Sequence, residues 1–399
     1  MKHAVRWIAG ILVLAITVWL ATAGLAWSRN RLPAPLPSPV EAPPADNAYP
    51  DYLQCVRALQ QKNQLLSLPG DQIPDASTRA SLLTPNREML ARFHRLHARP
   101  AVATYLEPGK DFVAALDFLP FGRLIALEAQ DALPGAPDRA LHTLVDGLIF
   151  ADRIQNGGTT LHLTMSYMAF FPLFQAFPAL LPALRRANCE AEAARLARVL
   201  EEKYPLQRIF KNERYVRVTQ LRRSMEPMGQ RILRMQWPGN ANEWNYLLKP
   251  KAPAIEALDR YMLHWVEQAE QPVRSIATQS VPQALSELMN DETLQPDFFL
   301  REIVRYHYLK ARLKLTCAAL LLEAHRQKRG QYPATLTELN ARVDLSDPFS
   351  NQPLRYRRNG AGYLLYSVGP DGQDDGGQTM VEVQLNLESK GDLTLSHRG

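Results

Sequence analysis

The chain contains nine histidines, and three of them lie at spacings that could serve a metal site or activate a nucleophile. His94 and His97 are three residues apart, so a helix would place both imidazoles on one face. His142 lies four residues before Asp146, which is also a same-face spacing. Imidazole and carboxylate groups so placed can bind a metal ion or transfer a proton.

A third pair, His264 and Glu267, has the form H-x-x-E, but none of these pairs completes a known motif. The sequence has no H-E-x-x-H, no G-x-S-x-G, no S-x-x-K with its partners and no Gly-rich phosphate loop. Nine histidines in 399 residues give one or two such proximities by chance. The sequence therefore predicts ordinary surface or core histidines, with no catalytic residue and no cofactor-binding residue.

The three cysteines, Cys55, Cys189 and Cys317, cannot all pair, and none lies in a C-x-x-C. One bridge between Cys55 and Cys189 is an alternative in an oxidising compartment. Cys317 falls in the apolar row of a predicted helix and is expected to be a small buried side chain. We expect no essential disulfide.

The formal net charge is +6, and basic residues concentrate in residues 203–234 and 301–329. A basic stripe could contact anionic lipid or another polyanion. The favoured interpretation is a solvated helix face, because aromatic residues are not interleaved as single-strand binders require. Nucleic acid is not an expected partner.

Residues 7–27 form a run of 21 residues without a charge. At about 1.5 Å per residue, a helix of this length spans a hydrocarbon core of about 30 Å. Lys2 and Arg6 give the run a basic leading end that stays in the cytoplasm, although Arg29 and Arg31 follow it. The pattern predicts a single-pass anchor in the membrane lipid of a bacterial inner membrane, with the rest of the chain outside the cytoplasm.

A cleaved signal peptide is the alternative for the same segment. Ala21, Thr22 and Ala23 have the small-x-small form of a cleavage site after an apolar stretch of suitable length. The apolar run continues to Trp27, however, and a Trp at the membrane interface favours retention. In either case the body lies outside the cytoplasm, as an anchored protein or as one secreted after cleavage near Ala23.

Two further segments are defined by their prolines. Residues 32–50 hold seven prolines and few large apolar side chains, which is typical of an extended, semi-rigid stalk. Residues 165–184 are apolar and uncharged but contain Pro172, Pro178 and Pro182. A buried helix pair is favoured there over a second membrane span, which would return the C-terminal region to the cytoplasm.

Between residues 51 and 297, apolar residues recur mainly at helical spacing. The clearest unit is residues 123–154, two helices joined by a turn, with Pro137 and Asp138 at the start of the second. This pair resembles one tetratricopeptide-type hairpin, although no period of about 34 residues repeats along the chain. We expect an irregular array of helical hairpins.

The last hundred residues change character from helix to strand. Apolar residues from Phe299 to Ala324 recur every three or four positions and predict one long helix, which Gly330 ends. Asn359 and Gly360 predict a hairpin with a type I′ turn, because both positions favour a positive φ. The strands expected from the apolar pattern are residues 354–358, 363–368, 381–387 and 392–396.

These elements predict an α+β fold with an N-terminal membrane helix, a mainly α-helical hairpin array and a small C-terminal module of helix and antiparallel sheet. The expected segments are an anchor or signal sequence (residues 1–31), a Pro-rich stalk (32–50), a helical domain (51–297) and a long helix with a β module (298–399).

Residues 321–377 contain, after the helix, GQYPATLTEL, DPFSNQPLRYR and GYLLYSVGPDGQDDGG in that order. This order resembles the C-terminal head region of the major pseudopilins of type II secretion systems. The chain lacks their prepilin cleavage site, and about 270 residues separate its membrane helix from the module. The resemblance covers the module alone and implies a shared module, not a pilus subunit.

In that family the loop after the second head strand resembles a calcium site. The resemblance makes Asp371, Asp374 and Asp375 candidate calcium ligands, since Ca²⁺ prefers hard oxygen donors on a flexible turn. The loop here is shorter than in the family and lacks its later acidic residue. An ordinary polar turn of Asp and Gly is the alternative.

The anchor, the stalk and the missing catalytic motifs together favour a scaffold or protein-interaction role in the cell envelope, with a protein partner there. The pseudopilin-like module suggests an accessory of a secretion machinery. The alternative is an envelope hydrolase whose carboxylate acid and base come from helices far apart in sequence, which no local motif would reveal.

Overall fold

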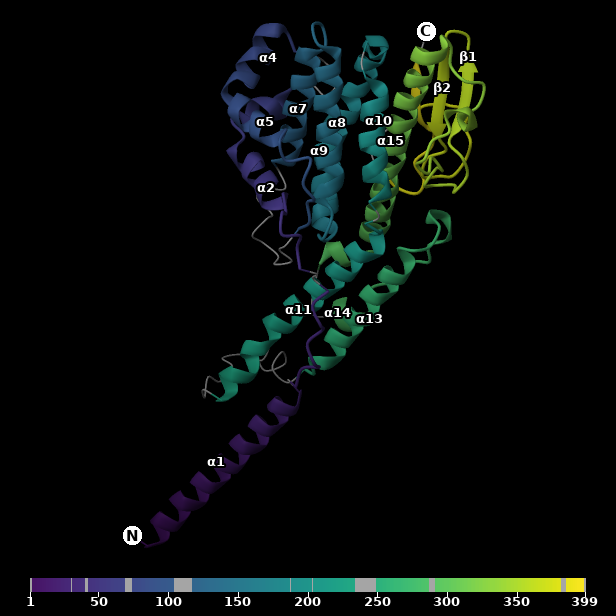
Figure 1. The fold of residues 1–399 in the computed structure, drawn as a ribbon. Coiled ribbons are helices and arrows are strands. Elements are labelled where there is room, and N and C mark those ends of the chain that lie inside the picture. The colour runs from purple at the N-terminus through teal and green to yellow at the C-terminus, as the bar shows by residue number, and fades with distance from the viewer. Residues whose placement is uncertain are drawn as a thin grey trace. The chain divides into compact units, whose positions relative to one another are not determined.

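The structure of the protein is a computed structural model. The structure describes residues 2–29, 31–39, 42–68, 74–103, 117–186, 188–202, 204–233, 249–286, 291–381 and 385–397. The described chain is mostly helical, with an apolar N-terminal helix and a three-stranded antiparallel sheet (Figure 1). The predicted α+β class is confirmed at this level.

The chain divides into two compact units, each built from separate stretches of sequence. The first unit comprises Met1–Pro39, Glu213–Trp265 and Gln279–Gln295, and the second comprises Val40–Asn212, Val266–Thr278 and Pro296–Gly399. The four segments expected from the sequence are a different division, drawn from local pattern, and they stay a prediction.

The first unit contains the N-terminal helix α1 (Lys2–Arg29), most of α11 (Leu206–Leu233) and α13 (Ala252–Gln268), and the short helices α14 (Gln283–Ser286) and η4 (Glu292–Leu294). The guanidinium of Arg214 donates to both carboxylate oxygens of Asp259, at 2.7 and 3.0 Å, and so joins α11 to α13. Arg217 contacts Glu213 at 2.6 Å and Asp291 at 3.3 Å. Part of the basic stretch expected to be a solvated face is therefore paired with carboxylates.

The second unit is a layer of helices followed by the sheet. Its helices are α2 (Tyr49–Ala58), α3 (Lys62–Ser67), α4 (Ala76–Leu83), η1 (Thr84–Asn86), α5 (Arg87–Phe93), α7 (Phe118–Ala132), α8 (Pro137–Ile154), α9 (Thr160–Leu180), η2 (Leu181–Arg186), α10 (Cys189–Glu201), η3 (Val273–Ser275), α15 (Pro296–Arg329) and η5 (Leu336–Leu339). Helices α7, α8 and α9 pack on one another, and α10 packs against α8 and α15 (Figure 1). The predicted pair of helices at residues 123–154 corresponds to α7 and α8.

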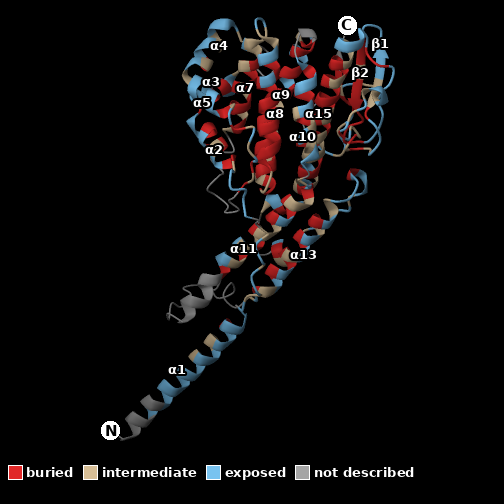
Figure 2. Ribbon diagram, in the orientation of Figure 1, coloured by how far each residue is buried: buried red, intermediate tan, exposed pale blue. Residues whose placement is uncertain are grey.

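The core of the second unit is aromatic where α2, α5, α7 and α8 meet. Phe150 on α8 lies 5.0–6.0 Å, centroid to centroid, from the rings of Tyr52, Phe93, Phe118 and Phe121. All five side chains are fully buried, and Figure 2 shows α8 buried along most of its length. Because α8 is buried from Thr143 to Ile154, each charged residue in that part of the helix needs a partner.

Helix α9 corresponds to the second apolar stretch of the sequence. It is one continuous helix that contains Pro172 and Pro178, and η2 follows it, so the expected helix pair is in fact a helix and a 3₁₀ turn. Its most apolar window is 56% buried, against 6% for α1. Helix α9 therefore serves as a core helix of the second unit.

The sheet packs against α15. Strands β1 (Arg355–Asn359), β2 (Gly362–Ser367) and β3 (Leu393–His397) are antiparallel in the order β1-β2-β3, with Tyr356 opposite Leu365 and Leu365 opposite Leu395. Leu365 and Leu395 are buried toward the helix layer. Strand β3 corresponds to the last strand expected from the sequence. Of the strand expected at 381–387, residues 382–384 lie outside the described residues, and residues 381 and 385–387 are not in a strand.

The hairpin is present, but its turn is one residue later than expected. Asn359 pairs with Gly362, so the two loop residues are Gly360 and Ala361. Gly360 has φ +58°, and Ala361 does not have a positive φ. A single positive φ at the first loop position is typical of a type II′ turn, which corrects the expected type I′ turn.

We predict that Gly122→Ala destabilises the protein, because a Cβ at this position of α7 would lie 2.2 Å from the backbone oxygen of Ala169 on α9. Overpacking of this kind costs about 1–3 kcal/mol, more than the gain of about 1 kcal/mol in helix propensity. The shift in denaturant midpoint, followed by circular dichroism, measures the effect.

Gly135→Ala is the matched control, since a Cβ there meets no atom within 4 Å. Its free energy of unfolding should be within about 0.5 kcal/mol of the wild-type value. Equal midpoints for the two variants would contradict the close approach of α7 and α9.

Candidate functional site

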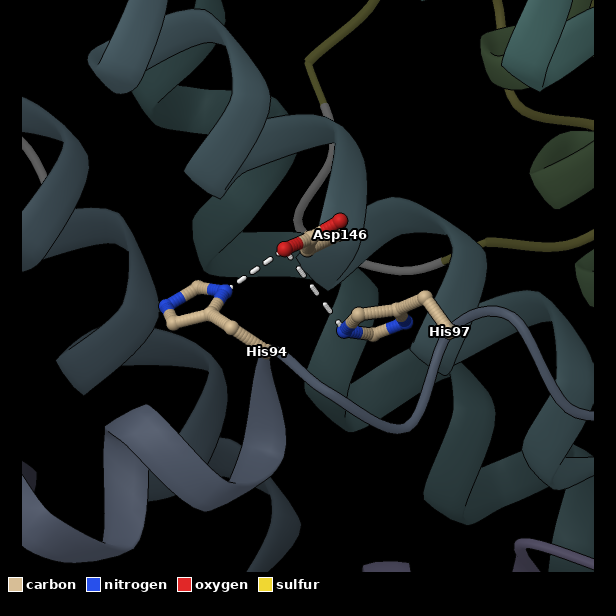
Figure 3. Close-up of side chains that lie close together, drawn as sticks. All are labelled: His94, His97 and Asp146. Carbon is tan, nitrogen blue, oxygen red and sulfur yellow. Dashed lines mark hydrogen bonds and ion pairs between the residues drawn. The ribbon is translucent and has the colours of Figure 1, made fainter.

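His94 and His97 lie in a tight turn directly after α5. The backbone N–H of His94 donates to the carbonyl of Leu90 at 3.0 Å, and that of Leu96 donates to the carbonyl of Phe93 at 3.0 Å. The chain therefore leaves α5 here but stays compact, and the two imidazole centroids are 6.4 Å apart. Figure 3 shows both rings directed toward Asp146 on α8.

Asp146 lies in the middle of α8, and its side chain has no exposed area. Its Oδ2 atom lies 2.6 Å from Nδ1 of His94 and 3.8 Å from Nε2 of His97 (Figure 3). Nε2 of His142, one helical turn earlier on α8, is also 3.8 Å from this oxygen. Three histidines that form separate pairs in the sequence thus lie around one oxygen of Asp146.

Glu128 on α7 engages the other nitrogen of His94. Its Oε2 atom is 2.9 Å from Nε2 of His94, and its Oε1 atom accepts a hydrogen bond of 3.4 Å from Arg139 on α8. His94 is therefore held between two carboxylates from two helices. Its imidazole joins the turn after α5 to both α7 and α8.

Helix α10 supplies the groups on the far side of Asp146. The guanidinium of Arg195 donates to the Oδ1 atom of Asp146 and, at 2.7 Å, to Glu192 on its own helix. Glu192 also lies 2.8 Å from Nδ1 of His142. These contacts extend the network from α8 to α10 and leave Oδ2 of Asp146 to the histidines.

The buried ring of His97 is oriented by aromatic neighbours. The Tyr52 hydroxyl lies 3.0 Å from Nδ1 of His97, and the Phe93 ring packs edge-on against the imidazole at 4.7 Å. The side chain is 5% exposed. Among the described residues, its Nε2 atom has no hydrogen-bond partner, because 3.8 Å to Asp146 exceeds hydrogen-bond length.

His94 and His97 differ in charge at neutral pH. Burial disfavours the charged form of His94, but hydrogen bonds to Asp146 and Glu128 outweigh it and raise the pKa to about 9. Burial lowers the pKa of His97 to about 3. Burial opposes ionisation of Asp146 too, yet the hydrogen bond from His94 and the nearby cations give it a lowered pKa. At neutral pH, His94 is an imidazolium beside a carboxylate, and His97 is neutral.

This arrangement can do two kinds of chemistry. Nδ1 or Nε2 of the two histidines and an oxygen of Asp146 lie within 4.8 Å of one another, which is compatible with coordination of one metal ion. The His94 imidazole also gives two carboxylates a hydrogen-bond partner, so it can serve only to satisfy a buried network of charges.

The sequence contained His94, His97, His142 and Asp146 as two local pairs, but it gave no reason to join them. The residues missed were those that complete the network: Tyr52, Glu128, Glu192 and Arg195. One signal was available, because Asp146 stands among apolar residues in LVDGLIF, where an unpaired carboxylate would be very costly. That signal identifies a paired carboxylate but not its partners.

The three candidate calcium ligands lie in a turn after β2, and each has a partner within the module. Asp371 accepts from the backbone of Gln373 at 3.1 Å, and Asp375 accepts from Gly391 at 3.0 Å. Asp374 pairs with Arg355 at 3.1 Å, which competes with a cation for this carboxylate. The calcium site stays a prediction.

The three cysteine thiols are buried and unbridged in the described chain. Burial raises the pKa of Cys55 to about 11 and the pKa values of Cys189 and Cys317 to about 12. These thiols therefore carry almost no thiolate at neutral pH and are poor nucleophiles.

We predict that Asp146→Asn lowers the free energy of unfolding by about 3 kcal/mol or more, because removing one partner leaves buried cationic groups uncompensated. Asp131→Asn is the matched control. Its side chain is 48% exposed and pairs with Arg79 at the surface, so the loss should be at most about 1 kcal/mol. Chemical denaturation of both variants measures the difference, and equal losses would mean that the network contributes nothing beyond a surface ion pair.

The chain matches no protein-family model, no curated protein and no solved structure. The arguments about its function therefore rest on the contacts described above.

Proposed function

We propose that the protein is anchored in a bacterial inner membrane by α1 and acts outside the cytoplasm as a scaffold or protein-interaction partner in a secretion or envelope machinery. The observation that carries this proposal is the exposed apolar surface of α1. Residues Gly10–Arg29 have a mean hydropathy of 2.0 with only 6% of their most apolar window buried.

The side chains of α1 are apolar around the whole helix. Trp7, Leu14 and Trp27 are 75%, 65% and 64% exposed, and Ile11 and Val13 are similarly uncovered. Burying one such side chain is worth about 1.5–3 kcal/mol, so leaving this helix in water would be strongly unfavourable. A lipid bilayer removes that cost, and a signal sequence cleaved near Ala23 is the alternative use of the same segment.

Ion pairs support a scaffold role, because they tie together helices that are distant in the sequence. Asp152 on α8 forms a largely buried pair with Lys310 on α15 at 2.7 Å, and Arg153 pairs with the partly exposed Glu202 at 2.6 Å. Groups that are paired inside low-dielectric surroundings hold one arrangement of helices against sliding. A stiff body of this kind can present a fixed surface to a partner.

The hydrolase alternative receives less support from the geometry. A general base needs a free lone pair near neutral pH, but both nitrogens of His94 contact carboxylates and its pKa is raised to about 9. Asp146 has a lowered pKa, whereas a carboxylic acid catalyst needs a raised one. The network is better suited to holding helices or an ion than to proton transfer.

We predict that a cysteine placed at Ala80, an exposed position of α4, is labelled from outside the cytoplasm by a membrane-impermeant maleimide. The native thiols are buried, so the wild-type chain should label only after denaturation and provides the control. Intact spheroplasts are labelled, and the mass of the recovered chain shows whether the N-terminal segment is retained. Labelling of Ala80→Cys only after lysis would contradict the proposed topology.

We predict that a photo-crosslinking residue at Arg357, an exposed position of β1, captures secretion or pilus components in cells. The same residue at Ala80, exposed on α4, is the matched control for non-specific capture. Capture at position 357 alone would identify the C-terminal module as the docking element. Background recovery at both positions would argue against a scaffold.

A further inference from the structure

We propose that His94, His97 and Asp146 form a binding site for a transition-metal ion of the zinc class. The site is independent of the partner proposed above. It is carried by the convergence of side chains from the turn after α5 and from α8 (Figure 3).

The spacing of the ligand atoms agrees with one shared ion. Atoms about 2.0–2.2 Å from a tetrahedral zinc lie about 3.3–3.6 Å from one another. Oδ2 of Asp146 is 2.6 Å from Nδ1 of His94 and 3.8 Å from Nε2 of both His97 and His142. The distances to His94 and His97 lie on either side of the tetrahedral value, and the ligand atoms of these two histidines and Asp146 all lie within 4.8 Å of one another. Side-chain movements of about 1 Å would bring these three atoms to one ion.

His97 provides a second, independent observation. Its Nε2 atom is buried, points toward Asp146 and has no hydrogen-bond partner among the described residues. A buried polar atom without a partner is costly, and a metal ion would satisfy it. At His94 the ion would displace the proton of Nδ1, since metal ions bind the neutral imidazole, and binding would release that proton.

The surrounding contacts are those that metal ligands require. Glu128 lies 2.9 Å from Nε2 of His94, which gives the carboxylate–histidine arrangement that orients metal-binding imidazoles. The Tyr52 hydroxyl holds Nδ1 of His97 at 3.0 Å, and Arg195 holds the second oxygen of Asp146. Each of these three ligands therefore has its remaining polar atom fixed by a neighbour.

The ligand set suits zinc better than calcium or magnesium. Two imidazole nitrogens beside one carboxylate oxygen favour a borderline cation, whereas the hard cations take oxygen ligands. Asp146 and His97 are buried, and His142 is 52% exposed, so an ion would enter at the His142 side. Three protein ligands would leave the fourth position of a tetrahedral site to water or to another ligand.

The test uses the full-length protein in detergent, with its affinity tag removed, and zinc chloride or cobalt chloride alone as the probe. We expect one equivalent of Zn²⁺ by calorimetry and by elemental analysis after dialysis. We also expect visible absorption bands of four-coordinate Co²⁺. His97→Ala should weaken Zn²⁺ binding at least a hundredfold, and Glu128→Gln should weaken it about 10–100-fold through the orientation of His94.

His325→Ala is the matched control, because His325 lies on α15 and is not part of the cluster. It should bind Zn²⁺ as wild type does. His94→Gln provides a variant that keeps its fold, since its amide can still donate to Asp146 or Glu128, and it should weaken binding and alter the Co²⁺ bands. No saturable binding at one equivalent, or unchanged binding in folded His97→Ala and His94→Gln, would overturn the proposal.

Discussion

A carboxylate in the middle of a buried helix has to be paired, and the arrangement of the second unit depends on how Asp146 meets that requirement. Helix α8 is enclosed by α7, α9 and α10, so water cannot supply the partner. The turn after α5 brings His94 to one oxygen, and α10 brings Arg195 to the other. A single side chain therefore fixes the relation of three separate chain segments. The same need recurs two turns later, where Asp152 on α8 meets Lys310 on α15.

The two apolar helices α1 and α9 show how surroundings, rather than composition, decide the use of a helix. Both are long and apolar enough to cross a bilayer. Helix α9 packs against α7 and α8, and Gly122 allows its backbone to approach α7 closely. Its hydroxyl groups are also used internally, since Ser166 donates to the carbonyl of Ala151 on α8 at 2.6 Å. Helix α1 has exposed apolar side chains along most of its length, and no comparable helix packs against it among the described residues of its unit. The apolar surface of α1 is therefore largely uncovered by its own unit.

Features that depend on neighbouring residues could be predicted from the sequence, and features that depend on distant ones could not. Helical spacing located α15. The hairpin was located within one residue, because the turn uses the freedom of Gly360 alone. The charge network was out of reach, since Asp146 meets His94 across 52 positions and Arg195 across 49. Local periodicity carries no information on which turn faces which helix.

The burial of all three thiols has a consequence for the fate of the chain in an oxidising compartment. While the fold holds, Cys55, Cys189 and Cys317 are shielded from oxidants and from small disulfides, and no bridge has to form for the chain to mature. Once the chain opens, the same thiols ionise more easily and can be captured as mixed or non-native disulfides. Opening would then become a one-way step that competes with refolding, and the lifetime of the protein would be governed by its unfolding rate rather than by its equilibrium stability.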